Sequence, residues 1–136
     1  MSLFVDTSVW SSAFRRDAPH PAPEVRELVR AIKAGEELLT TGLVLQELLQ
    51  GFAGPRHRTQ LLDRFSALPL LLPDRQDDIN AADLRNACRR RGLQIGTIDA
   101  LLAQLCLRHD LTLLTMDLDF RGVAEHCALK LWTPPA

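Results

Sequence analysis

Apolar residues follow two patterns along the chain: short continuous runs, and longer stretches with apolar positions three and four residues apart. The longer stretches predict amphipathic helices. The short runs are typical of strands, and they lie at residues 2–5, 38–40, 68–72, 111–115 and 129–132. The run at 68–72 lacks alternation and predicts a fully buried strand. Because strands and helices alternate, we predict an α/β fold: a three-layer α/β/α sandwich around a mainly parallel sheet of about five strands.

Proline, glycine and capping side chains mark the expected helix boundaries. Pro23 suits a first helical turn and Gly35 a helix end, while Gly51 and Gly54 are expected to end the next helix. A further helix opens at Pro55, and Leu118 to about Glu125 reads as a short helix. Capping hydroxyls are expected from Thr7 and Ser8, from Thr40 or Thr41, and from Thr97. The segment from Arg15 to Pro23 holds three prolines and is expected to be a loop or flap.

A long helix is predicted from Asp74 to Arg91. Asp77 lies in its first turn, where the helix dipole favours an acid, and Arg89-Arg90-Arg91 followed by Gly92 ends it. Contact with RNA is the alternative interpretation of these three arginines. Arg56, Arg58 and Arg64 are expected on a solvated face, and Trp10 and Phe14 in the core.

Composition narrows the class of protein. The 136 residues fit a single domain, 1–136, and the 46% apolar and 24% charged content is ordinary for a globular protein. No apolar run approaches the ~18 residues that span a bilayer, and no secretory signal is visible, so we expect a cytoplasmic protein and no membrane partner. Three cysteines without close pairing are expected to be buried and to form neither a disulfide framework nor a zinc site. A net charge of −1 does not indicate nucleic-acid binding. Arginine outnumbers lysine fourteen to two, which is weak support for phosphate contacts because arginine can bind phosphate with two hydrogen bonds.

Four acidic residues lie at element ends: Asp6, Glu47, Asp99 and Asp117. A carboxylate beside apolar segments is costly unless it is hydrogen-bonded, paired or bound to metal. Ligands of open α/β sheets bind beyond the carboxyl ends of the strands, where Asp6 and Asp117 are expected. Glu47 and Asp99, early in their helices, can line the same crevice. Such an oxygen-rich cluster suits Mg²⁺ or Mn²⁺.

Each acid also has a purely structural interpretation. Asp6 could cap the following helix or form an Asx turn, and Asp117 could be a helix N-cap. Asp99 and Asp119 could be first-turn acids favoured by the helix dipole. Glu47 could sit at a solvated edge of a helix face that it shares with Leu43, Gly51 and Gly54. The joint pattern, rather than any single acid, therefore carries the prediction.

The sequence resembles a PIN-domain ribonuclease of the VapC toxin type over essentially the whole chain. The motifs that carry the resemblance are Phe4-Val5-Asp6-Thr7-Ser8-Val9-Trp10, Leu45-Gln46-Glu47-Leu48-Leu49-Gln50-Gly51, Ile98-Asp99-Ala100-Leu101-Leu102-Ala103 and Leu113-Leu114-Thr115-Met116-Asp117-Leu118-Asp119-Phe120. Each motif is short, and together in this order they are fairly specific.

The resemblance implies a PIN-like fold and a metal-dependent endoribonuclease that hydrolyses RNA phosphodiester bonds. It implies a catalytic Mg²⁺ (or Mn²⁺) site formed by Asp6, Glu47, Asp99 and Asp117, with Asp119 as an accessory or substitute ligand. Asp117 and Asp119 compete for the fourth position, and Asp117 is favoured because it is closer to the strand end. Thr115 matches the family's hydroxyl position, and hydroxyls of Thr7 and Ser8 are expected to support the site. The implied partners are an RNA substrate, a cognate antitoxin and a second copy in a homodimer.

Three other classes of protein compete with this interpretation. A phosphoacceptor receiver domain would need an acidic pair after the first strand and an acceptor aspartate ending the third. An aspartyl phosphatase would want an acid where Ser8 stands. A catalytically silent PIN-like binding protein would keep the acids only to engage a partner. The flap around 19–23 and the arginines at 15, 16, 89, 90 and 91 are candidate RNA contacts.

Overall fold

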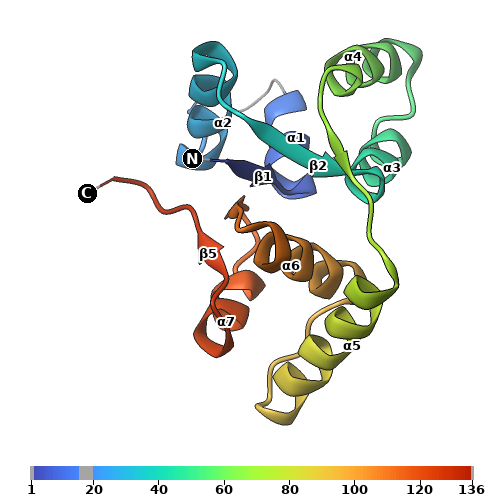
Figure 1. Cartoon of the computed structure of the whole chain (residues 1–136). Coiled ribbons are helices and arrows are strands. Elements are labelled where there is room, and N and C mark those ends of the chain that lie inside the picture. Colours follow the sequence, from blue (N-terminus) through green and yellow to red (C-terminus); the bar gives the residue numbers. More distant parts are fainter. Residues whose placement is uncertain (1, 16–19, 136) are drawn as a thin grey trace.

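The computed structural model of the chain describes residues 2–15 and 20–135 (Figure 1). Its strands form a five-stranded sheet in the order β3-β2-β1-β4-β5, and every neighbouring pair is parallel. The strands are β1 (Leu3–Val5), β2 (Leu38–Thr41), β3 (Leu70–Leu71), β4 (Thr112–Leu114) and β5 (Lys130–Leu131). The predicted parallel sheet of about five strands is therefore confirmed.

Helices cover both faces of this sheet. Helices α1 to α4 gather on one side and α5 to α7 on the other (Figure 1). Right-handed crossovers account for this division, because the chain moves from β1 to β3 in one direction and then returns across the sheet to β4 and β5. The helices are α1 (Thr7–Phe14), α2 (Pro23–Ala34), α3 (Gly42–Gly51), α4 (Pro55–Ser66), α5 (Arg75–Arg90), α6 (Thr97–His109) and α7 (Asp119–His126). The predicted α/β/α sandwich is confirmed.

The strand order reverses between β1 and β4, the two central strands. Val5 pairs with Leu114 at the last register position, so the residues that follow leave the sheet side by side. The side chains of β1 and of Leu113 and Leu114 in β4 are fully buried, and Val9 and Trp10 of α1 pack into the same core. The two chain segments after β1 and β4 are thus held together by the best-packed part of the molecule.

Most helix boundaries follow the local signals. Pro23 begins α2, and Gly35 ends it in a left-handed conformation (φ 68°) that favours glycine. Thr41 caps α3 by accepting a hydrogen bond from the backbone N–H of Leu43 at 3.0 Å. Asp74 and Asp77 form a reciprocal capping box at the start of α5. The boundaries expected at Pro23 and Gly35 and the cap expected from Thr40 or Thr41 are confirmed, and the capping box adds to the first-turn position expected for Asp77.

The predicted third strand is wrong in length and burial. β3 has two residues at the edge of the sheet, and Leu70 and Leu72 are 42% and 80% exposed. Pro69 lies inside the predicted run and Pro73 follows it directly, and proline lacks the N–H that a central strand needs, so the run forms an edge strand.

Several expected caps are also wrong. Helix α3 ends at Gly51, and Gly54 instead precedes α4. Gly96, not Thr97, is the N-cap of α6 and no side chain caps that end. The hydroxyls of Thr7 and Ser8 do not cap α1 but reach toward acids, as described below. Residues 20–22 form irregular structure as expected, whereas Arg16 and Pro19 lie outside the described residues.

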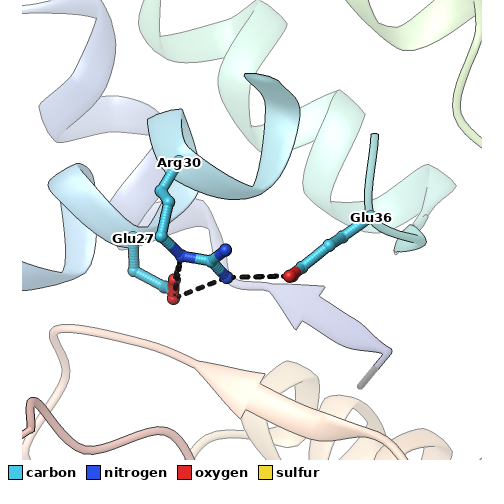
Figure 2. A network of polar contacts seen from close by, with 3 residues as sticks. All are labelled: Glu27, Arg30 and Glu36. Carbon is cyan, nitrogen blue, oxygen red and sulfur yellow. Dashed lines mark hydrogen bonds and ion pairs between the residues drawn. The ribbon is translucent and has the colours of Figure 1, made fainter. Parts of the chain in front are cut away.

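A buried acid in α2 is neutralised within the fold. Glu27 is 7% exposed, and Figure 2 shows Arg30 reaching between Glu27 and Glu36. Arg30 forms an ion pair with Glu27 one turn earlier, and a second with Glu36 at 3.0 Å. The hydrogen bond with Glu27, supported by that with Glu36, raises the pKa of Arg30 above its ordinary value. This network ties the end of α2 to the segment that leads into β2.

Within the described residues, no helix has the length and apolar character required to cross a membrane.

Candidate functional site

Asp6 sits where β1 passes into α1. Its backbone carbonyl accepts the first hydrogen bonds of the helix from Val9 and Trp10, but its side chain makes no cap bond. The carboxylate is 6% exposed, and its Oδ2 accepts hydrogen bonds from the hydroxyls of Ser8 at 2.9 Å and Thr115 at 2.8 Å. The capping interpretation of Asp6 is therefore wrong, because neighbouring hydroxyls hold the side chain away from the helix N–H groups.

Two further hydrogen bonds extend this hydroxyl network. Thr7 donates to Oε1 of Glu47 at 2.9 Å, which links the start of α1 to the middle of α3. Ser8 accepts from the backbone N–H of Met116 at 3.0 Å, which links the same start to the segment after β4. Asp6, Glu47 and the end of β4 are therefore fixed relative to one another through Thr7, Ser8 and Thr115.

The segment after β4 carries the two competing aspartates. The hydroxyl of Thr115 accepts from the backbone N–H of Asp117 at 3.0 Å, and Oδ1 of Asp117 accepts from the N–H of Asp119 at 2.9 Å. Asp117 is part-buried and lies two residues before α7, whereas Asp119 is exposed in its first turn. Asp117 thus stays at the strand end, while Asp119 is directed to the surface.

The pKa of Asp99 is shifted by the other acids. Partial burial, followed by the negative charges of Asp6, Asp117, Glu47 and Asp119, raises the pKa of Asp99 to about 6. The charge of Asp117 acts more strongly than that of Asp119. These effects indicate that the other four carboxylates lie near Asp99. We call these five residues the acidic cluster.

The negative charge of the acidic cluster is not balanced by ion pairs with basic side chains of the described residues. In residues 2–15 and 20–135, none of its five carboxylates forms an ion pair with lysine, arginine or histidine. Over the same residues, no three acidic, histidine or cysteine side chains converge closely enough to hold an ion directly. The carboxylates are thus concentrated without being arranged as a closed cage.

This donor set fits a hard divalent cation. Mg²⁺ keeps several waters and is commonly held through one or two protein carboxylates, so an open arrangement of oxygens meets its needs. The nearly buried carboxylate of Asp6, stabilised by hydroxyls and not by a positive side chain, is the strongest sign of that fit.

Cys106 lies behind the site in α6. Burial, followed by the negative charge of Asp6, raises the pKa of its thiol well above the ordinary range. The thiol therefore stays protonated and acts as packing, as expected for the buried cysteines. Cys88 is likewise fully buried, and Cys127 is partly so.

One buried acid was assigned only a helix-dipole role from the sequence. Asp77 is 1% exposed and is paired with Arg108 of α6 at 2.5 Å. Burial would raise the pKa of Asp77, but hydrogen bonds from the Asp74 N–H, Gln104 and Arg108 together lower it. The only sequence signal was the capping spacing of Asp74 and Asp77, since Arg108 lies 31 residues away.

The fold and site agree with one protein family. Residues 3–126 match the family model described as the PIN domain, and the chain belongs to that family. The receiver-domain alternative fails on the structure as well, because the third strand is a short edge strand that ends at Leu71. The membership also leaves the aspartyl-phosphatase alternative without support.

Among curated proteins, the chain is similar to VapC ribonuclease Mb1587 of Mycobacterium bovis and to ribonuclease VapC11 of Mycobacterium tuberculosis. Each is 32% identical over 125 residues, which cover 90% of this chain and 92% of the relative. The structure resembles VapBC-1 from nontypeable Haemophilus influenzae (TM-score 0.74, 18% identity, 97% of both chains). It also resembles VapC20 of M. tuberculosis, described as a sarcin-ricin loop cleaving toxin (TM-score 0.64, 18% identity, 88% of this chain and 93% of that chain). At these identities, the solved structures show the fold.

Proposed function

We propose that this chain is an endoribonuclease of the VapC type, the toxin of a toxin–antitoxin pair, with residues 1–136 acting as one PIN-like domain. Family membership and relatives named as ribonucleases support the reaction class. The observation that carries the proposal is the acidic cluster at the point where the strand order reverses, with no positive side chain of the described residues to neutralise it.

The proposed cofactor is Mg²⁺ or Mn²⁺, held by Asp6, Glu47, Asp99 and Asp117. A bound divalent cation would lower the pKa of a water molecule and offset negative charge on the phosphodiester. Asp119 is the candidate accessory ligand, and its exposure and weaker influence on Asp99 make Asp117 the better fourth ligand.

The residues around the cation site have distinct proposed roles. Ser8 and Thr115 both donate to Oδ2 of Asp6, so they orient that carboxylate and leave its charge in place. Thr7 does the same for Glu47. Asp99, with its pKa near 6, is proposed to lose its proton as the cation binds, so cation affinity should fall in mildly acidic solution.

The proposed partners follow the same family. A solved structure that this fold resembles is VapBC2 from Rickettsia felis bound to a DNA fragment from their promoter (TM-score 0.73, 19% identity, 97% of this chain and 98% of that chain). We propose that a cognate antitoxin binds and inhibits this chain, that the chain forms a homodimer, and that it acts in the cytoplasm, where RNA is its substrate.

The proposal is tested by incubating purified protein with total bacterial RNA and sequencing the new ends. Wild-type protein should cut with added Mg²⁺ or Mn²⁺ and stop when EDTA removes the cation. Asp6→Asn should lower cleavage by more than about a hundredfold, because an amide is a poor ligand for a hard cation. Asparagine can still accept the bonds from Ser8 and Thr115, so circular dichroism should show an intact fold.

Two results would decide against this function. Cleavage that persists in EDTA, or that a folded Asp6→Asn variant retains in full, would remove the metal-site role. A wild-type protein that cuts no RNA under any of these conditions would favour the catalytically silent binding protein.

A further inference from the structure

One end of the α5–α6 hairpin is strongly basic. Residues 84–98 hold four arginines and no acid, although the whole chain has a net charge of −1. We call these arginines the basic tip: Arg85, Arg89, Arg90 and Arg91. Within residues 2–15 and 20–135, no carboxylate forms a salt bridge with any of them. Arg89 and Arg90 complement the dipole at the end of α5, but Arg85 lies too far from that end for the same explanation.

Arg85 is hydrogen-bonded to the loop that connects α5 to α6. Its Nε donates a hydrogen bond to the carbonyl oxygen of Ile95 at 2.8 Å, which fixes the plane of the guanidinium group. Arg85 and Arg89 line a hollow of about 210 Å³ whose other wall is formed by Leu93, Gln94 and Ile95. A small hollow lined by two arginines suits a compact anion such as a phosphate group, which arginine can bind with two parallel hydrogen bonds.

The chain leads from the hollow directly to the start of α6, where Asp99 lies. Ile95 is followed directly by Gly96, and a Cβ placed on Gly96 would lie 3.8 Å from Oδ2 of Asp99. Arg85 and Thr97 also line one shared groove between α5 and α6. The loop between α5 and α6 therefore lies beside Arg85 and Arg89 and ends next to the carboxylate of Asp99.

Charge explains why a nuclease would need this arrangement. The acidic cluster repels every phosphate of an approaching RNA, and a cation at the cluster offsets that repulsion only locally. Phosphates on either side of the cut bond need positive partners of their own, which must lie close to the cluster but outside it. Arg85 and Arg89 lie outside the cluster, and Arg85 lines a groove together with Thr97, two residues before Asp99.

We propose that Arg85 and Arg89 form a subsite for a backbone phosphate of the RNA, a few nucleotides from the bond that is cut. This inference rests on the proposed ribonuclease function and assigns a place where the substrate is held. Because a phosphate contact carries no base information, the subsite positions the strand and does not select its sequence.

Binding measurements test the subsite separately from catalysis. Asp6→Asn protein is titrated with a labelled mixed-sequence single-stranded RNA of about 30 nucleotides, long enough to extend beyond one binding site. Arg85→Gln/Arg89→Gln is compared with Arg56→Gln/Arg58→Gln, which removes the same charge from exposed residues of α4. The first pair should weaken binding roughly tenfold and make the slope of log affinity against log salt shallower by about 1.4, or about 0.7 per lost contact. The control pair should change affinity less than about twofold.

Arg89→Gln alone is a control for misfolding in the double variant. It is expected to fold normally, because Arg89 has no side-chain hydrogen bond among the described residues. It should make the salt slope shallower by about 0.7 with unchanged thermal stability. Equal effects of the two double variants, or an unchanged slope in Arg89→Gln, would overturn the subsite. The subsite would also be overturned if Arg85→Gln/Arg89→Gln bound RNA as tightly as before but bound an acidic protein partner more weakly.

A cleavage assay distinguishes failure of the subsite from failure of the ribonuclease proposal. With Asp6 intact, Arg85→Gln/Arg89→Gln should raise KM on long RNA and leave kcat near the wild-type value. Dinucleotides, whose single phosphodiester is the bond to be cut, leave the subsite empty and should be cut equally by both proteins. Wild-type protein without cleavage would refute the ribonuclease proposal alone, whereas cleavage with identical KM in both proteins would refute the subsite alone.

Discussion

Asp6 and Asp77 are both nearly buried aspartates near the start of a helix, yet their surroundings differ in kind. Asp77 is held by an arginine, an amide and a backbone N–H, which together neutralise it. Asp6 is held by two hydroxyls and faces other carboxylates. A buried acid with an internal cation stabilises the fold, whereas one that lacks such a partner is available to bind a cation from solution.

The largest expected effect on stability comes from removing the carboxylate of Asp77, which is paired with Arg108. Asp77→Ala should lower the free energy of unfolding by about 3 kcal/mol, because it removes both the capping box and the buried one of the two acids that pair with Arg108. Activity per folded molecule should stay close to the wild-type value. Urea unfolding with Asp6→Asn as the matched control checks this, since Asp6→Asn should retain wild-type stability or gain some.

The pH dependence of that stability has a defined sign. The folded-state pKa of Asp77 lies below its ordinary value, so its contribution is complete above the ordinary pKa of 3.8 and is lost as pH falls below it. Asp77→Ala should therefore differ most from wild type near neutral pH. An equal difference at strongly acidic pH would contradict the role given to the ion pair.

Two aspartates that lie two residues apart after β4 are expected to differ in their effect on activity. Asp117→Asn should lower RNA cleavage about tenfold to a hundredfold, because the charge of Asp117 acts more strongly on Asp99 than that of Asp119 does. Asp119→Asn should lower it less than about threefold. Initial rates at saturating Mn²⁺ measure both variants, and a reversed order would make Asp119 the fourth ligand.

The smallest expected effect concerns Asp99 and pH. Because its folded-state pKa is about 6 rather than 3.8, ionised Asp99 destabilises the cation-free protein above pH 6, and this penalty disappears as pH falls toward 3.8. Asp99→Asn should therefore gain about 1 kcal/mol at pH 7.5 in EDTA, after allowance for solvent screening, and gain nothing near pH 4.

Cation addition supplies the control for Asp99. Wild-type protein should gain thermal stability when Mn²⁺ is added at pH 7.5, whereas Asp99→Asn should gain much less. The opposite outcomes are that Asp99→Asn loses stability in EDTA, or gains the same stability at pH 7.5 and near pH 4. Either result would contradict destabilisation of the ionised Asp99 carboxylate by burial and by the neighbouring charges.

Sequence reasoning located the acids because their positions follow from topology. Asp6 and Asp117 come after apolar runs, and parallel strands bring their carboxyl ends to one edge. The roles of Thr7 and Ser8 were harder to predict, because a hydroxyl at a helix start has the same sequence signature whether it caps the helix or orients a carboxylate. Their assignment needed the distances to Glu47 and Asp6.

Asp77 and the third strand mark where local patterns stop being informative. The partner of Asp77 is Arg108, whose distance along the chain conceals the ion pair until α5 and α6 are packed together. A run of leucines predicts burial, but whether its strand lies at the centre or the edge of the sheet depends on its neighbours, and among the described residues no strand lies beyond β3. In both cases, the missing information is tertiary.

The prolines around β3 have a consequence for how the molecule behaves when concentrated. An exposed edge strand can recruit a strand from another molecule and start aggregation. Here Pro69 and Pro73 allow only three leucines between them, and neither proline can donate a backbone hydrogen bond. We expect this short outer edge to be a poor template for intermolecular strand pairing, so Leu70 and Leu72 can face water at little risk to solubility.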